Sequence, residues 1–429
     1  MNLKSSFKRT IKSKGARPFL IAGFLSNLGD WIYFVGMSAF MYNQFGPVAI
    51  GLLSIIRQAA GMLFAPIAGY LSDKYSKKNL ILLSNVFSAL LMLVLLMFTL
   101  QNKHYLFLYL IVGILLTLVA SIDRIATLSL VPSLVNKEDR LALNSLLNTV
   151  GTVSLMIAPI FGGLLLSSNA LSLNFIFNSI SFMISFFLIL SVPSNIENED
   201  KNNSLKTEEN KNSHSLKSTY QTWTLGIKYI FNDKQIRPLT ILMMLNHVVV
   251  GTTWVFTPKL AELIGQKNVG IGYLLTAIGI GSIIGTFIGA YIGNKSLYRA
   301  IGLGVIFLPI TLIFCGIHDY LILSYTLVIS LGIFANIGDG PMWTLLQKFT
   351  PQESSGRVFA TVDVLSVAGM SLGSLITGIL IDKLAFQYSL LTFGGIILLL
   401  SIYSTMELMQ KSKKEEDIVG NQGVVANDK

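Results

Sequence analysis

The sequence predicts an all-α integral membrane protein with twelve transmembrane helices arranged as two pseudo-symmetric bundles of six. Hydrophobic residues make up 52% of the 429 positions and charged residues only 13%, against about 25% charged in soluble proteins. Apolar runs close to the roughly 20 residues needed to cross a bilayer recur along the chain. Helices are expected because a lipid-exposed segment must satisfy its backbone polar groups internally.

The apolar runs fall into two groups of six. Those of the first half are expected at 18–43, 48–70, 80–99, 105–129, 142–167 and 171–192. Those of the second half are expected at 238–258, 269–293, 300–318, 320–346, 358–382 and 386–407.

A polar stretch that begins at residue 193 separates the two groups. It reads PSNIENEDKNNSLKTEENKNSHSLK and has too few apolar residues to form a core. A short interfacial helix is predicted after this stretch, because four apolar or aromatic residues recur at the spacing of one helix face: Tyr220, Trp223, Ile227 and Ile230. The expected parts are a basic N-terminus 1–17, a first bundle 18–192, a linker 193–236, a second bundle 237–407 and a tail 408–429.

The distribution of basic residues predicts the orientation. The net charge is +10, and the cations gather at the N-terminus and in every second loop, whereas the other loops carry only Lys103, Lys259, Lys267 and Lys383. The positive-inside rule therefore places both termini in the cytoplasm of a multi-pass protein of the cell membrane. Topology explains the basic charge, so no nucleic-acid partner is implied.

The two halves resemble each other weakly. The run VAIGLLSIIRQAAGMLFAPIAGY at 48–70 aligns without a gap with VGIGYLLTAIGIGSIIGTFIGAY at 269–291, and a second alignment pairs Asp123 with Asp339. Internal duplication of this kind is typical of secondary transporters.

The polar turn after the second apolar run carries a family signature. Gly69, Leu71, Asp73, Lys77 and Lys78 match the pattern Gly-x-Leu-x-Asp-x-x-Gly-Arg-Arg/Lys. Ser76 replaces the second Gly, and Lys77 stands where Arg is usual. Together with the six-plus-six arrangement and the linker, this turn makes residues 15–407 resemble the major facilitator superfamily.

The resemblance implies a latch at the cytoplasmic mouth. Gly69 would let the second helix approach a neighbour closely, and Asp73 would meet the N-terminal end of the eleventh helix, beside Arg357. Lys77 and Lys78 would belong to the same latch. The alternative is that these lysines serve only the positive-inside topology.

The fifth span contains GTVSLMIAPIFGG, which resembles the antiporter motif of the family's exporters. Its residues are Gly151, Ala158, Pro159, Gly162 and Gly163, with Ala158 in place of Gly. Such a helix can bend and seal at the bundle interface, or it can simply pack tightly. LSNLGDWIYFVG and LGIKYIFNDKQIRPLTILMML further resemble the macrolide-efflux and siderophore-exporter branch, the drug:proton antiporter-3 group.

Two charges are expected deep in the bilayer, where an unpaired charge costs about 2.5 to 3.5 kcal/mol. Asp30 and Arg57 both lie roughly 18 to 20 Å from the inner ends of their antiparallel helices. They form either a structural ion pair or a site in the central cavity whose protonation responds to the side that is open. Asn27, one turn before Asp30, shares its face.

Other polar residues of the spans have two interpretations each. Asp123, Arg124 and Asp339 lie nearer the cytoplasmic ends and form gate salt bridges or a proton relay. By resemblance to the family, Arg124 stands roughly where a basic residue linked to proton transfer is found. His247, beside Asn246, relays protons or is merely hydrogen-bonded.

These features predict a carrier that exports a small amphipathic molecule against inward proton flow. An uncoupled or import-type carrier of a lipid or nutrient is the alternative, and a membrane receptor or enzyme is disfavoured. The sequence offers no phosphate-binding loop, metal-ligand cluster or catalytic triad. No cofactor, metal or obligate protein partner is expected, and Cys315, alone, excludes an intramolecular disulfide.

Overall fold

The computed structural model describes residues 3–101, 104–167, 171–193, 226–317, 319–352 and 354–427. Within these ranges the chain is helical and contains no strand. Twelve helical segments of the described residues are long and apolar enough to cross a membrane. The predicted all-α membrane fold is therefore confirmed.

The chain divides into two compact units. Unit 1 comprises Met1–Leu216 and Gly265–Thr276, and unit 2 comprises Lys217–Ile264 and Ala277–Lys429. The helix α11 (Lys267–Gly293) therefore starts in unit 1 and continues in unit 2.

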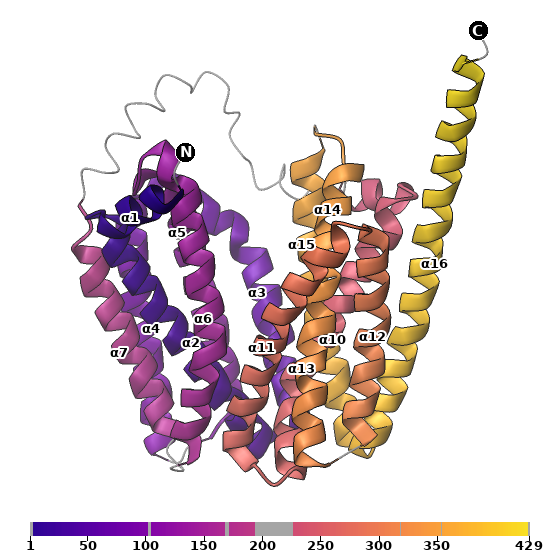
Figure 1. Cartoon of the computed structure of the whole chain (residues 1–429). Helices are drawn as coiled ribbons and strands as arrows, with labels where there is room; N and C mark the ends of the chain where they lie inside the picture. The colour runs from indigo at the N-terminus through magenta and orange to yellow at the C-terminus, as the bar shows by residue number, and fades with distance from the viewer. Residues whose placement is uncertain are drawn as a thin grey trace. The chain divides into compact units, whose positions relative to one another are not determined.

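Unit 1 is built around α2, which packs against both α6 and α7 (Figure 1). The α4 helix packs against α5 and α7, and α3 packs against α5. The short α1 precedes α2 and contacts α2 and α6. The helices of this unit are α1 (Leu3–Lys12), α2 (Ala16–Phe45), α3 (Pro47–Lys74), α4 (Lys77–Leu100), α5 (Leu106–Leu130), η1 (Val131–Ser133), η2 (Lys137–Asp139), α6 (Arg140–Ser167) and α7 (Leu171–Leu190).

Unit 2 is built around the pairs α10 with α15 and α12 with α16. In addition, α12 packs against α13. Besides most of α11, the helices of this unit are α10 (Ile236–Leu263), α12 (Leu297–Ile317), α13 (Leu321–Ile337), α14 (Asp339–Phe349), α15 (Ser355–Lys383) and α16 (Phe386–Asn427).

The tenth span differs from the prediction of one unbroken helix at 320–346. It is interrupted at Gly338, between α13 and α14. Pro341 has no backbone N–H to donate to the carbonyl of Ile337, four residues earlier, so the helical hydrogen-bond ladder is broken at this point. The last helix, α16, also runs on to Asn427, beyond the expected end at residue 407.

Glycines lie at close helix contacts inside the units, and many large apolar side chains are exposed. A Cβ added to Gly251 of α10 would collide with the carbonyl of Met370 in α15, and one added to Gly285 of α11 would collide with the carbonyl of Ile333 in α13. By contrast, Phe107 is 78% exposed and Ile322 is 81% exposed. An apolar exterior over close-packed helices suits lipid as the solvent.

The predicted linker lies mostly outside the described residues, which resume at 226. Tyr220 and Trp223 of the predicted interfacial helix fall in the part that is not described. Residues 226–232 are helical. Ile230 is fully buried in a core cluster of unit 2 with Leu239 and Val358, so this end of the predicted helix packs on protein.

Candidate functional site

Asp30 lies near the middle of α2, about 21 Å along the helix from Ala16 at 1.5 Å per residue. Its side chain is exposed. The amide Nδ2 of Asn178 in α7 donates a hydrogen bond to Oδ1 of Asp30 at 3.4 Å. Asn178 is itself fully buried. A buried amide therefore holds one oxygen of a carboxyl group that remains accessible.

Glycines of α2 make this contact with α7 possible. A Cβ at Gly29 would collide with the side chains of Asn178 and Ser181, and a Cβ at Gly36 would collide with Asn174. Asn174 Nδ2 also donates to the carbonyl of Ile32 at 3.3 Å. The two helices thus approach closely enough for polar side chains of α7 to reach the α2 backbone and Asp30.

Arg57 does not form the direct ion pair that was one of the two interpretations. Its Nε donates to Oγ1 of Thr117 in α5 at 3.0 Å, and the pair Asp30–Arg57 is absent from the ion pairs of the described residues. Arg57 still acts on Asp30 through its charge. In α3 it lies 17 residues before Lys74, about 26 Å from that end, and so roughly one turn deeper than Asp30.

Two further candidate residues of unit 1, Asp123 and Asn27, differ in whether they interact with Asp30. Asp123 of α5 interacts with Asp30 electrostatically, so the unit contains two acids that influence each other. Asn27 instead donates Nδ2 to the carbonyl of Gly23 in its own helix at 2.7 Å.

In unit 2 the structure brings His247 and Asp339 near each other. The two side chains interact electrostatically, and Nδ1 of His247 lies 2.9 Å from the carbonyl oxygen of Met243. Asn246 is buried and donates to the carbonyl of Ala335 at 3.1 Å. Asp339 also lines a groove of about 390 Å³, whose polar lining residues include Thr286, Asn294, Asn336 and Thr344.

The loop signature divides into an exposed part and a buried part. Asp73 is exposed, and a Cβ added to Gly69 would meet nothing within 4 Å. Lys78, in contrast, is only 8% exposed. Its Nζ donates to the carbonyl of Leu190 at 2.9 Å and to that of Val192. Lys78 thus binds the C-terminal end of α7, where a cation is favoured by the helix dipole.

The remaining gate candidates make no ion pair among the described residues. Arg124 and Arg357 are exposed, Lys77 is half-buried, and Asp123 is half-buried. A latch between Asp73 and the start of α15 would join unit 1 to unit 2, so it stays a prediction.

The antiporter-type motif of α6 packs against the first residues of α11 within unit 1. A Cβ at Gly272 would collide with the carbonyl of Pro159, and a Cβ at Gly163 would lie 2.8 Å from the carbonyl oxygen of Val269. Thr276 Oγ1 donates to the carbonyl of Met156 at 3.0 Å.

The other motif residues of α6 make different contacts. Gly162 faces α2, since its Cβ would lie 2.9 Å from that of Val35. Ala158 is fully buried. A Cβ at Gly151 would meet nothing within 4 Å.

The sequence interpretation missed Asn178 and Thr117. A signal was available for Asn178, because Asn174, Asn178, Ser181 and Ser185 follow one another at intervals of four, three and four residues on a single face of α7. Polar residues in a membrane helix usually face protein. Thr117 lies between Gly113 and Ser121, at intervals of four residues on one face of α5, but this stripe of small residues does not single it out as the partner of Arg57.

Comparison with known proteins gives the family. The family model for the Major Facilitator Superfamily matches residues 19–373 and 239–423. The enterobactin exporter EntS of Escherichia coli O1:K1 / APEC is 23% identical over 332 residues, which cover 77% of this chain and 76% of that protein. The same figures hold for EntS of Shigella boydii serotype 18.

Solved structures share the fold. The nucleoside transporter NupG superposes with a TM-score of 0.68 at 14% identity, over 95% of this chain and 99% of NupG. A bacterial homologue of the iron transporter ferroportin, in an inward-facing state, gives 0.67 at 16% identity, over 91% of this chain and 98% of that one. The chain is therefore a multi-pass membrane transporter that belongs to the major facilitator superfamily.

Proposed function

We propose that the chain exports a small amphipathic compound, of the macrolide or siderophore kind, in exchange for protons. Asp30 is the coupling carboxylate of this proposal, and Arg57 adjusts its charge state. Similarity to an enterobactin exporter supports efflux, and the α6 motif supports antiport. Transport proceeds by alternating access, in which the binding cavity opens to one side of the membrane at a time.

One observation carries the proposal. Asp30 is an exposed carboxyl group at mid-helix that accepts a hydrogen bond from Asn178 and has a cation nearby, without a locked ion pair. A carboxylate in a strong ion pair would hold its charge throughout the cycle. A carboxylate with a single neutral donor can lose and regain a proton as its surroundings change.

The proton gradient can supply the energy. A charge that crosses a potential of 100 mV releases about 2.3 kcal/mol, which corresponds to more than a tenfold concentration ratio at about 1.4 kcal/mol per factor of ten.

The test is transport in inverted membrane vesicles. Replacing Asp30 with Asn should abolish gradient-driven uptake, because Asn cannot exchange a proton. Asp319 is exposed between α12 and α13, and the control Asp319→Asn should leave uptake unchanged. Substrates are chosen first from the compounds whose toxicity falls in cells that express the chain. Addition of substrate to energised vesicles should also release protons from the lumen. Undiminished uptake by the Asp30→Asn variant, or transport without any pH change, contradicts the proposal and favours an uncoupled carrier.

A further inference from the structure

The short helix α1 is attached by a polar contact to η2, which directly precedes α6. Asp139 is 4% exposed and accepts hydrogen bonds from Ser6 Oγ at 2.6 Å and from two nitrogens of Arg9, Nη2 at 2.7 Å and Nε at 3.0 Å. The hydrogen bond to Asp139 raises the pKa of Arg9. Thr10 is fully buried. The inward face of α1 is therefore polar.

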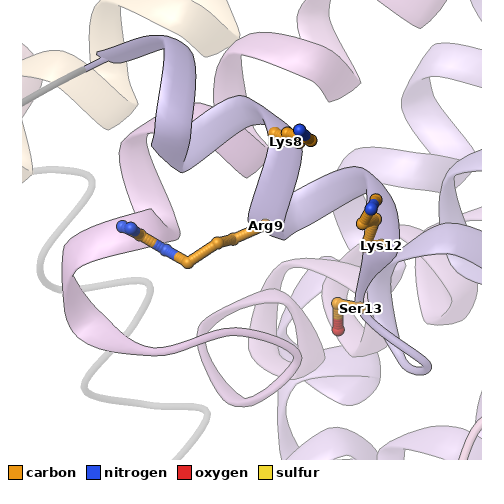
Figure 2. Close-up of a pocket in the computed structure, with 4 residues that line it drawn as sticks. All are labelled: Lys8, Arg9, Lys12 and Ser13. Atoms are coloured by element: carbon orange, nitrogen blue, oxygen red, sulfur yellow. The ribbon is translucent and has the colours of Figure 1, made fainter.

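The outward face of α1 combines cations with an apolar side chain. Lys8 and Lys12 are exposed, and Ile11 between them is 50% exposed. Figure 2 shows Arg9 extending away from Lys8 and Lys12. Neither lysine belongs to an ion pair of the described residues. This distribution is the reverse of a water-exposed helix, in which the isoleucine would be covered and the serine and threonine would face outward.

The fold fixes where this outward face lies. α1 ends at Lys12, and α2, which is long enough to span the membrane, begins at Ala16. The helix therefore lies beside the membrane surface whichever way the chain is inserted. Lys8, Arg9, Lys12 and Ser13 line an open groove of about 440 Å³ there.

We propose that the outer face of α1, formed by Lys8, Ile11 and Lys12, binds the phosphate-bearing headgroup of an anionic membrane lipid. The two ammonium groups meet the phosphate, and Ile11 inserts beside the acyl chains. Interfacial helices combine these two contacts, since lysines near an anionic surface are attracted to it and the apolar side chain leaves water. A free phosphate would use the lysines but would gain nothing from Ile11. Because Arg9 attaches α1 to Asp139 of η2, directly before α6, the bound lipid would act directly on unit 1.

The experiment reads lipid contact at residue 11. A bimane dye is attached to Ile11→Cys in a Cys315→Ser background, and the full chain is placed in vesicles that contain brominated phosphatidylglycerol or brominated phosphatidylcholine over the same series of mole fractions. Brominated phosphatidylglycerol should reach the same quenching at roughly one-thirtieth of the mole fraction that the zwitterionic lipid needs, because two lysines contribute to the attraction. The Lys8→Gln/Lys12→Gln double variant should lose this preference.

A matched control tests whether the effect is local. Lys295→Gln/Arg299→Gln removes two exposed cations at the turn between α11 and α12, where Arg299 stands in the first turn of α12, and should keep the preference. Both double variants should retain the thermal unfolding midpoint of the parent, since Lys8 and Lys12 are exposed. The proposal is wrong if the two lipids quench equally, if both double variants lose the preference alike, or if millimolar inorganic phosphate abolishes it.

Discussion

Asn178 shows how one buried amide can define a functional carboxylate. Within the part of the chain that the structure describes, Asn178 donates a hydrogen bond to Asp30. It also accepts one from Ser181 Oγ at 3.0 Å, which fixes the orientation of its amide. Asp30 attracts attention in the sequence as a charge in an apolar run. Asn178 is marked only as one of several polar residues on a face of α7, and its contact with Asp30 depends on which face of α7 meets α2.

Replacing Asn178 with Leu should slow proton-driven transport about tenfold or more, since a hydrogen bond to a charged group contributes about 1.5 to 3 kcal/mol. The midpoint of the pH–rate profile should also change, because the carboxyl group loses its donor. The measurement is initial uptake into inverted vesicles as a function of pH. Asn174→Ala is the control, since Asn174 lies one turn away and bonds to the carbonyl of Ile32 instead of Asp30. An unchanged pH profile in Asn178→Leu would show that Asn178 only packs.

Lys78 shows the limit of interpretation from charge alone. Its position in a basic loop predicted a cytoplasmic cation of the latch, and the positive-inside rule explains it equally well. The structure buries its stem and directs its ammonium group to the last carbonyls of α7. That use depends on α7 ending beside the start of α4. A single sequence does not contain this information.

At the scale of elements, the pair α10 and α15 depends on glycines at the crossing. Besides Gly251 facing Met370, a Cβ at Gly373 would collide with the carbonyl of Val248. Ser374 Oγ donates to the carbonyl of Gly251 at 2.8 Å. Backbone atoms cannot move aside as a side chain can, so these contacts specify small residues.

Gly251→Ala should therefore lower the thermal unfolding midpoint of the purified protein in detergent, because overpacking a core costs about 1 to 3 kcal/mol. The control is Gly395→Ala in α16, where the added Cβ meets nothing within 4 Å. There Ala should be neutral or stabilising, since it favours a helix over Gly by about 1 kcal/mol. Equal midpoints for the two variants would refute the close approach of α10 and α15.

At the scale of the whole molecule, the fold was largely predictable and the site was predictable only in part. Twelve spans follow from hydrophobic run length, which the absence of water enforces locally. The break at Gly338 was also readable, through Pro341. The hydrogen-bond partners of Asp30, Arg57 and Lys78 could not be predicted, because each partner depends on how separate helices rotate and pack. The contact of Arg9 with Asp139, which attaches α1, joins residues 130 positions apart. No local sequence pattern predicts this contact.

Orientation is the whole-molecule property that remains a prediction, with both termini in the cytoplasm. It follows from basic loops alone, and cysteine labelling tests it in this chain. Cys315 is 1% exposed and is replaced by Ser so that no other thiol reacts. Gln101 and Glu138 are both exposed in unit 1, at opposite ends of the spans. In intact cells a membrane-impermeant maleimide should label Gln101→Cys fully and Glu138→Cys only after permeabilisation. The reverse pattern would invert the topology, and it would also move the outer face of α1 and the loop containing Asp73 to the other side of the membrane.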